Sequence, residues 1–452
     1  MLYVHINDYR KQNFFLLAAS YGFYAAFSPW FLLILLVSSL VDYFLGQGIM
    51  EGMDSRRRKL ILATSLTLNL TVLGLFKYFN FFVQNGAEMV RLLGLKAHVA
   101  TLQIILPVGI SYYTFQKIGY IVDIYRGKIR PLKSITSFLL YISFFPKLLS
   151  GPIENAVHFL PQILNPRMIK KEDVRIGLLY MVTGYFSKVV LADSLAPMVD
   201  RVFDYPDQVT GITVLFGILC YSLQIYGDFA GYSLMAQGLS RLMGFDLIRN
   251  FKTPYFSINP REFWNRWHIS LSLFLRDYVY IPLGGNQKSE TMTCFNLMVT
   301  MSLAGLWHGA GWNYFLWGAY HGVLLCVSRL LHLSKSSLNR ITLPVVLQMS
   351  TTFFLISAGW LIFRAQRMVD VRVLIARIFT DFSWDYETSL YLKALAPICV
   401  LLFAYDYLQW KSKDDQVLLK SSALVKNLAY SFMAISIAAV GFRQMPFIYF
   451  QF

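Results

Sequence analysis

The sequence predicts an all-α, polytopic membrane protein. Three observations lead to this class: apolar residues make up 56% of the 452-residue chain, charged residues make up 15%, and the apolar residues gather in long runs. A soluble domain is nearer to about 25% charged, and a bilayer core of about 30 Å needs about 20 apolar residues in a helix. The composition therefore argues against a disordered chain, a disulfide-rich secreted domain and a soluble enzyme.

The apolar runs predict about 11 transmembrane helices and additional re-entrant segments. The run 135–150 contains Pro146 and ends in a Ser-Gly-Pro turn, so we expect a broken or re-entrant helix there. Irregular backbone at membrane depth is tolerated only where protein or a cavity surrounds it. The candidate segments are 13–27, 29–46, 60–83, 104–122, 135–150, 175–192, 211–240, 293–308, 312–331, 341–363, 390–408 and 424–442.

The basic residues of the loops predict the orientation of the chain. Their densest cluster places loop 47–59 in the cytoplasm, and loop 123–134 falls on the same side. The acidic loop 193–209 falls outside. Loop 364–389 also falls outside although it carries four arginines, so we expect a further re-entrant segment or a miscounted helix there. Basic cytoplasmic loops explain the net charge of +16, and no nucleic-acid partner is expected.

A polar stripe runs along the aromatic-rich segment 261–286. If its first half forms one helix, five polar residues spaced three or four apart share a face. The helix then either lies in the cytoplasmic membrane interface or lines an internal tunnel with its polar face, and the residues alone do not separate these interpretations. The five residues are Arg261, Asn265, His268, Ser272 and Arg276.

Two further histidines lie in apolar sequence. His308 precedes the uncharged connection 309–311, which is expected to be buried. A neutral imidazole there could act as a general base near pH 7, but the residues alone favour a buried structural histidine. His321 lies on the following helix beside Gly318 and Gly322, whose spacing favours close helix packing. We expect His321 to form a hydrogen bond between helices.

Other chemistries lack a motif in this chain. There is no zinc-protease, nucleophile-elbow or nucleotide-binding pattern, and the four cysteines read as small apolar residues. No metal site is expected. Charged residues within the apolar runs indicate either an ion pathway or anchors at helix ends, and the second interpretation is favoured for most of them. These residues are Asp42, Asp123, Lys188, Asp228 and Arg364.

Two motifs in the sequence are specific enough to indicate a protein family. The stretch FWNRWHISLSLFLRDYVYIPLGGN (263–286), followed by LWHGAGWNYFLWGAYHG (306–322), resembles the membrane-bound O-acyltransferase superfamily, most closely its alginate O-acetyltransferase type. The teichoic-acid D-alanyl transferases are more distantly similar. The terminal PFIYFQF (446–452) agrees, and the likeness covers nearly the whole chain. Leu234 departs from the pattern, because many alginate-type members carry an acidic residue there, and the N-terminus looks shorter than in members with an extra leading segment.

The resemblance implies one membrane domain over 1–452, built around a central tunnel, with its catalytic core at about 104–332. It makes His308 the catalytic residue and His268 a second functional position, so it overrides the structural interpretation of His308. We expect Arg261, Arg266 and Arg276 either to attract the phosphates of coenzyme A or to serve only as positive-inside residues. The expected substrate-binding residues are Asn265, Arg261, Arg276, Trp267 and Trp307.

The resemblance also implies the reaction. An acetyl group would pass from a cytoplasmic thioester, acetyl-CoA or another acyl donor, to an extracytoplasmic polysaccharide, directly or through a partner transferase of the SGNH-hydrolase type. No bound cofactor is expected, and the expected location is the bacterial inner membrane. A D-alanyl or other acyl transferase fed by a carrier protein is the first alternative, and a transporter or flippase is the second. The polysaccharide and the oligomeric state stay open.

Overall fold

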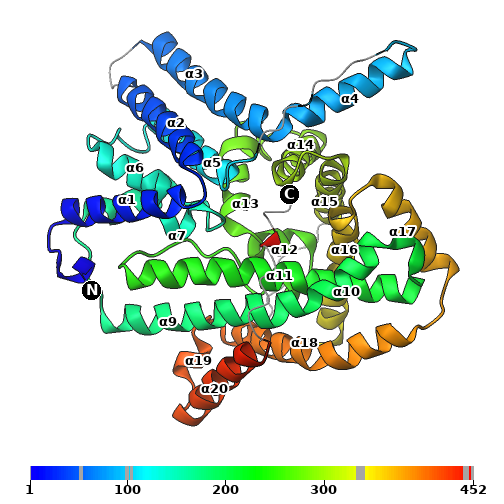
Figure 1. Ribbon diagram of the computed structural model, residues 1–452. Helices are drawn as coiled ribbons and strands as arrows, with labels where there is room; N and C mark the ends of the chain where they lie inside the picture. The colour runs from blue at the N-terminus through cyan, green and yellow to red at the C-terminus, as the bar shows by residue number, and fades with distance from the viewer. Residues whose placement is uncertain are drawn as a thin grey trace. The chain divides into compact units, whose positions relative to one another are not determined.

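Helices are the regular secondary structure of the part of the chain that the structure describes. This computed structural model describes residues 2–49, 54–96, 101, 105–331, 342–440 and 447–448, and among them every regular element is a helix (Figure 1). The predicted all-α polytopic class is confirmed, whereas the total of about 11 spans stays a prediction. Seven helical stretches of the described residues are long and apolar enough to cross a membrane: Pro29–Gly48, Ser55–Leu92, Lys171–Asp204, Gly211–Arg241, Leu343–Arg364, Tyr386–Ser412 and Ala423–Val440.

The chain divides into two compact units. The first comprises Met1–Val174 with Leu239–Ile248, and the second comprises Arg175–Gly238 with Arg249–Phe452. The single domain over 1–452 therefore stays a prediction. The helices of the first unit are η1 (Leu2–His5), α1 (Tyr9–Ala25), α2 (Pro29–Gly48), α3 (Ser55–Leu73), η2 (Gly74–Tyr78), α4 (Phe79–Leu92), α5 (Ile110–Tyr125), α6 (Ile135–Ser143), α7 (Phe145–Leu148) and α8 (Ala156–Leu164).

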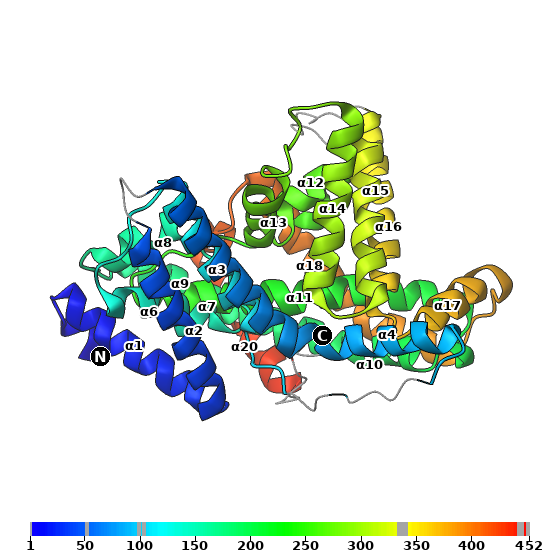
Figure 2. The same ribbon diagram turned by 90° about the horizontal axis from the view of Figure 1, so that it is seen from above.

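The remaining helices lie wholly or mainly in the second unit. These helices are α9 (Lys171–Phe186), η3 (Ser187–Ala192), α10 (Asp193–Asp204), η4 (Pro206–Gln208), α11 (Gly211–Leu242), η5 (Pro254–Phe256), α12 (Pro260–Arg266), α13 (Ile269–Leu275), η6 (Arg276–Tyr280), α14 (Glu290–His308), α15 (Trp312–Leu330), α16 (Leu343–Arg364), α17 (Met368–Thr380), α18 (Tyr386–Ser412), α19 (Val417–Lys420) and α20 (Ala423–Val440). Helices α14, α15 and α16 pack side by side in both views (Figures 1 and 2).

The broken helix predicted for 135–150 is confirmed. Helix α6 ends before Phe144, and α7 begins at Phe145 with Pro146 in its first turn. Proline is tolerated at that position because its missing N–H would have no partner within the helix. The break buries Lys147 completely, with its ammonium donating to the Gln116 side chain at 2.5 Å.

Most charged residues predicted within the apolar runs form ion pairs inside their own unit. Asp42 lies 3.5 Å from Lys117 in the first unit. In the second unit, Lys188 lies between two carboxylates, and Arg364 of α16 lies 2.9 Å from Asp200 of α10. These contacts compensate the buried charges, because an unpaired charge at membrane depth is costly. Asp42 and Asp228 lie inside helices and not at helix ends, so the anchoring interpretation stays a prediction.

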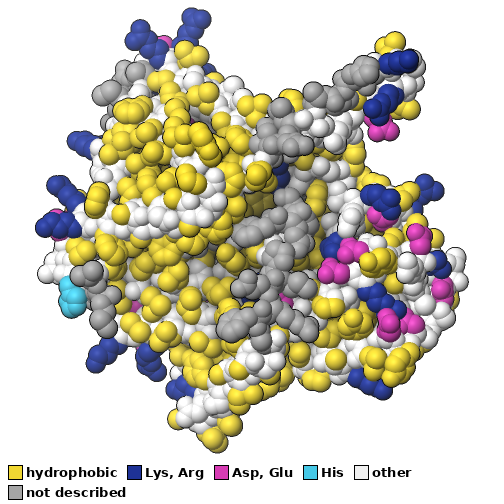
Figure 3. Space-filling model, viewed as in Figure 1, with side chains coloured by type: hydrophobic (Ala, Val, Ile, Leu, Met, Phe, Trp, Pro, Cys, Tyr) yellow, Lys and Arg dark blue, Asp and Glu magenta, His cyan; other side chains and the backbone are white. Residues whose placement is uncertain are grey.

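Loop 364–389 is largely an ordered helix. Its helix α17 lies beside η4, where Arg377 donates to the Asp207 carbonyl at 2.7 Å, and Gln366, just before α17, donates to Asp204 at the end of α10 at 3.0 Å. Together with the Arg364 ion pair, these contacts place loops 193–209 and 364–389 on one side of the second unit. Figure 3 shows basic and acidic side chains interspersed over α10 and α17. Of the four arginines that conflicted with the predicted orientation, Arg364, Arg367 and Arg377 each form an ion pair with an aspartate.

The prediction of one continuous helix over 261–276 is wrong. Asn259 begins α12 by accepting the N–H of Glu262, but α12 ends at Arg266 and α13 starts at Ile269. Between them, His268 adopts the left-handed conformation with φ 42° and ψ 54°. A left-handed residue turns the backbone off the helix axis, which the spacing of polar residues cannot reveal.

Candidate active site

The backbone around His268 is held by one asparagine. The Asn250 carbonyl accepts the N–H of Ile269 at 3.0 Å, and its side-chain oxygen accepts both the hydroxyl of Ser270 at 2.7 Å and its N–H at 3.3 Å. The Asn250 amide donates to Ser233 of α11 at 3.2 Å. These bonds satisfy N–H groups that the first turn of α13 would otherwise leave unpaired. Asn250 therefore stabilises the left-handed turn at His268.

The imidazole of His268 is enclosed by aromatic rings. Its side chain is fully buried, with Phe229 edge-on at a centroid distance of 4.6 Å and Trp307 at 5.7 Å. Burial lowers the pKa of His268 to about 3. The ring is therefore neutral near pH 7 and suits hydrogen bonding to a substrate better than proton donation as an imidazolium.

His308 lies next to His268. The two ring centroids are 6.4 Å apart, and His308 is 4% exposed. Trp317 and Phe363 stand edge-on to His308 at 5.1 and 5.3 Å. The structure thus brings together the two histidines that the sequence placed 40 residues apart, and it surrounds His308 with aromatic rather than aliphatic groups.

The close packing of α14 and α15 fixes the position of His308 at the end of α14. A Cβ atom added to Gly318 would collide with the Met301 carbonyl group of α14. This contact bears out the close helix packing predicted from Gly318 and Gly322. At the connection, Gly309 is buried, and Asn313 donates to the Ala365 carbonyl at 3.1 Å, tying α15 to the end of α16.

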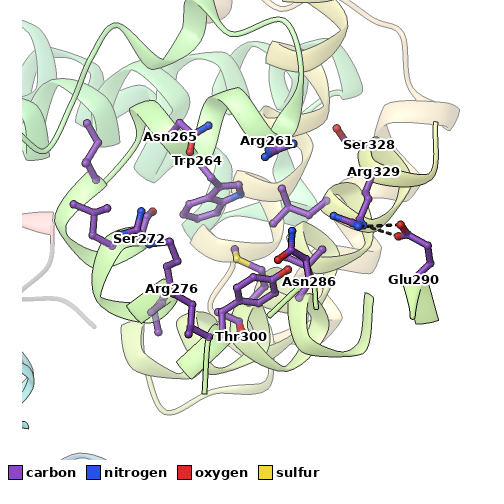
Figure 4. A pocket seen from close by; sticks show the side chains of 18 residues that line it. Arg261, Trp264, Asn265, Ser272, Arg276, Asn286, Glu290, Thr300, Ser328 and Arg329 are labelled. Atoms are coloured by element: carbon purple, nitrogen blue, oxygen red, sulfur yellow. Dashed lines mark hydrogen bonds and ion pairs between the residues drawn. The ribbon is translucent and has the colours of Figure 1, made fainter. Parts of the chain in front are cut away.

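A pocket of about 800 Å³ opens on α12, α13, η6, α14 and α15 (Figure 4). Four of the five residues of the predicted polar stripe line it, and only His268 does not. Because α12 and α13 both turn toward the pocket, the break in the helix does not separate these side chains. The polar residues that line it include Arg261, Asn265, Ser272, Arg276, Asn286, Glu290, Thr300, Ser328 and Arg329.

The predicted site residues therefore fall into two groups. Arg261, Asn265 and Arg276 line the pocket, whereas His268, His308, Trp267 and Trp307 do not. Both tryptophans are buried: Trp267 stacks on Phe263 at 5.4 Å, and Trp307 contacts the two histidines. Met301 at the pocket wall and His308 lie on the same helix, two turns apart, which is about 10 Å along its axis.

The arginines of the segment differ in their partners. Arg261 makes no ion pair with any described residue, and its exposed guanidinium faces the pocket (Figure 4). Arg276 pairs with Asp277 at 2.7 Å. Arg266 is tied to Glu262 at 2.7 Å and to the backbone of 252, and it does not line the pocket. Of the three arginines, Arg261 is thus the best placed to receive an anionic ligand.

His321 does not form the predicted hydrogen bond between helices. Its ring is fully buried, and neither ring nitrogen has a hydrogen-bond partner among the described residues. Trp264 and Trp317 stand against it at 5.2 and 4.8 Å. The prediction was wrong because the facing position on α16 is Gly359, which offers no polar side chain.

Sequence reasoning missed two polar residues of the site. Asn250 precedes the motif and was not singled out, because it bonds the first turn of α13 from 20 residues away and is not the N-cap residue of that helix. Arg329 lines the far wall of the pocket and pairs with Glu290 at 2.5 Å (Figure 4). Of the predicted terminal motif 446–452, only Phe447 and Ile448 fall among the described residues.

Comparison with known proteins supports the sequence motifs. Residues 128–334 match a family described as MBOAT, membrane-bound O-acyltransferase family. A protein named "Probable alginate O-acetylase AlgI" from Pseudomonas aeruginosa is 39% identical over 382 residues, covering 84% of this chain and 72% of that protein. A "Peptidoglycan O-acetyltransferase" from Helicobacter pylori is 35% identical over 396 residues, covering 81% and 74%.

A more distant relative covers less of the chain. The "Teichoic acid D-alanyltransferase" of Streptococcus thermophilus is 31% identical over 252 residues, which are 51% of this chain and 59% of that protein. The names of these relatives all describe the transfer of an acyl group. None of them describes a transporter or a flippase.

Proposed function

Because this chain belongs to the membrane-bound O-acyltransferase family and is an integral membrane acyltransferase, we propose that it moves an acetyl group from a cytoplasmic thioester to an extracytoplasmic polysaccharide. Relatives that align over most of the chain are named as O-acetylating enzymes of alginate and of peptidoglycan. This similarity supports an O-acetyl transfer to a glycan. The D-alanyl transferase aligns with only about half of this chain, so a carrier-fed D-alanyl donor is the alternative.

The observation that carries the proposal is the pair of histidines behind the pocket. His268 and His308 stand 6.4 Å apart, close enough for one small acyl group to reach both imidazoles. The pocket provides a polar, arginine-bearing entrance on the same helices. A donor anchored at Arg261 must extend its acyl end about 10 Å beyond Met301 to reach His308, which suits a long flexible thioester arm.

We assign the proton transfer to His308. The acceptor hydroxyl oxygen attacks the thioester carbonyl carbon while His308 takes the hydroxyl proton. A C–O bond forms, the C–S bond breaks, and the departing thiolate takes the proton from the imidazolium. In the alternative course, His308 first accepts the acyl group itself, releases the thiol, and then passes the acyl group to the hydroxyl. Both courses leave His308 unchanged at the end.

The other predicted residues support this step. A neutral His268 would donate a hydrogen bond to the thioester carbonyl and so stabilise the developing oxyanion. Arg261 and Arg276 would bind the phosphates of coenzyme A, with Asn265 lining the same pocket. Trp267 and Trp307 would act through packing, since Trp307 contacts both histidines.

Membership of the family supports the acceptor side of the proposal. We place the chain in the bacterial inner membrane, with donor entry from the cytoplasm and the acceptor outside. The acetyl group would pass either to a sugar hydroxyl or to a serine of a separate SGNH-hydrolase-like transferase. No bound cofactor or nucleic acid is required for this reaction.

Replacement of His308 tests the proposal. Purified chain in proteoliposomes is given radiolabelled acetyl-CoA with alginate or peptidoglycan fragments, and a parallel arm supplies D-alanyl carrier protein. His308→Ala should lower transfer at least 100-fold, whereas His158→Ala, on the exposed side of α8, should keep it. Normal transfer by a folded His308→Ala protein would refute the assignment. Transfer from the carrier alone would select the D-alanyl alternative.

A further inference from the structure

We propose that Asp228 is a positioning residue for acyl transfer, because it anchors the chain at Phe447 and Ile448 and thereby holds the Phe229 ring against His268. The inference rests on the proposed function of His268. It assigns a role to Phe447 and Ile448 and to a buried carboxylate that the chemistry of the site does not use directly.

Asp228 belongs to a buried charge cluster in the second unit. Lys188 of η3 lies 2.6 Å from one Asp228 oxygen and 2.7 Å from Asp193. The Asp228 residue is 1% exposed, and it sits within the span Gly211–Arg241. The lysine lies in a π-helical turn, which is an element found frequently at functional sites. Asp193 alone would neutralise the charge of Lys188, so charge pairing does not explain the presence of Asp228.

The second oxygen of Asp228 explains the presence of this carboxylate. It accepts the backbone N–H of Ile448 at 2.8 Å, and this bond joins residues 220 positions apart. Phe447 and Ile448 are each 4% exposed. A buried N–H without an acceptor is destabilising, so the carboxylate determines whether this stretch can lie here. One Asp228 oxygen thus pairs with Lys188, and the other binds the backbone at Ile448.

The anchored stretch reaches the histidine through one ring. Phe447 packs against Tyr232 at 4.4 Å and against Phe229 at 6.1 Å. Phe229, the residue after Asp228, stands edge-on to His268 at 4.6 Å with an interplanar angle of 85°. Without Phe447, the Phe229 ring would gain room to rotate away. The imidazole of His268, a residue in the strained left-handed conformation, would then lose its contact with one of the aromatic rings that enclose it.

A matched pair of variants at one position tests the anchor. Asp228→Asn and Asp228→Leu have similar size, and both leave the Lys188–Asp193 ion pair in place. Because Lys188 keeps Asp193, the Asn amide oxygen can turn to the Ile448 N–H, whereas Leu offers no acceptor. We expect kcat with acetyl-CoA to stay within about threefold for Asp228→Asn and to fall about tenfold or more for Asp228→Leu. KM for acetyl-CoA should stay within about twofold in both.

A second variant separates the anchor from the charge cluster. Phe447→Ala leaves Lys188, Asp193 and Asp228 intact, so it should reproduce the loss of kcat in Asp228→Leu. Wild-type kcat per folded molecule in Phe447→Ala or in Asp228→Leu would overturn the inference. Equal losses in Asp228→Asn and Asp228→Leu would also overturn it, because they would locate the effect in the charge and not in the acceptor.

The outcome is distinguishable from failure of the proposed function. If His268→Ala and His308→Ala retain transfer, the function assigned to the histidines fails whatever Asp228 does. If these histidine variants lose transfer while Asp228→Leu keeps its kcat, only the positioning role fails.

Discussion

The left-handed conformation of His268 makes an unusual stability prediction. An L-residue in this region costs about 1–2 kcal/mol, and glycine avoids that cost. Glycine loses about 0.4–1 kcal/mol through the greater freedom of the unfolded chain, and an alanine Cβ adds some buried area. The free energy of unfolding of His268→Gly should therefore equal that of His268→Ala or exceed it by up to about 1 kcal/mol.

Ser272, one turn later and inside α13, provides the control position. In a helix interior glycine is less stable than alanine by about 0.5–1 kcal/mol. The order of the two residues should therefore differ between the positions: alanine is favoured at 272 and not at 268. Because each comparison is made between two variants at one position, the loss of the imidazole or of the hydroxyl cancels.

Thermal unfolding of the four purified variants in detergent, followed by tryptophan fluorescence, measures the effect. A difference of 1 kcal/mol corresponds to about 2 °C or less in a chain of this length, so replicate scans at one rate are needed. If alanine proves more stable than glycine at 268 by the same margin as at 272, residues 261–276 form one helix, and the break at His268 is refuted.

Three further perturbations follow from other contacts. Gly231→Ala would place its Cβ 2.6 Å from the Gly184 carbonyl oxygen, so the free energy of unfolding should fall by about 1–3 kcal/mol. Gly22→Ala, with open space around it, should be neutral or stabilising, and equal stability of the two variants in chemical denaturation would contradict this packing. The His158 ring donates a hydrogen bond to the Glu154 carboxylate at 2.9 Å, which raises the pKa of His158, so the protonated ring stabilises the fold below its unfolded pKa of about 6.5 and loses this contribution as pH rises through the raised value. The Tm of the wild type should therefore fall relative to that of His158→Gln across this pH window, and parallel curves would disprove the linkage. Arg261→Ala should raise KM for acetyl-CoA about tenfold with little change in kcat. The Arg266 side chain is held by Glu262 outside the pocket, so Arg266→Ala should leave KM near its normal value, and the reverse order in steady-state kinetics would exclude the pocket as the donor site.

The sequence was sufficient for the class of the fold. Long apolar runs have one stable solution in a bilayer, the helix, because every backbone group must be hydrogen-bonded within the segment. The interruption at Pro146 and the close approach at Gly318 were also readable, since a missing N–H and a missing side chain act locally. The motifs around His268 and His308 were enough to predict the family.

The arrangement of the candidate site required the coordinates. The spacing of polar residues assumes an unbroken helix. It could not show that the backbone turns at His268, so that the His268 side chain does not line the pocket that Arg261 and Ser272 line. Contacts between distant segments, such as Asn250 with Ser270 or Ile448 with Asp228, depend on how the helices pack. Local sequence carries the propensity of each segment, but the partner of a buried polar group is chosen only when the chain has folded around it.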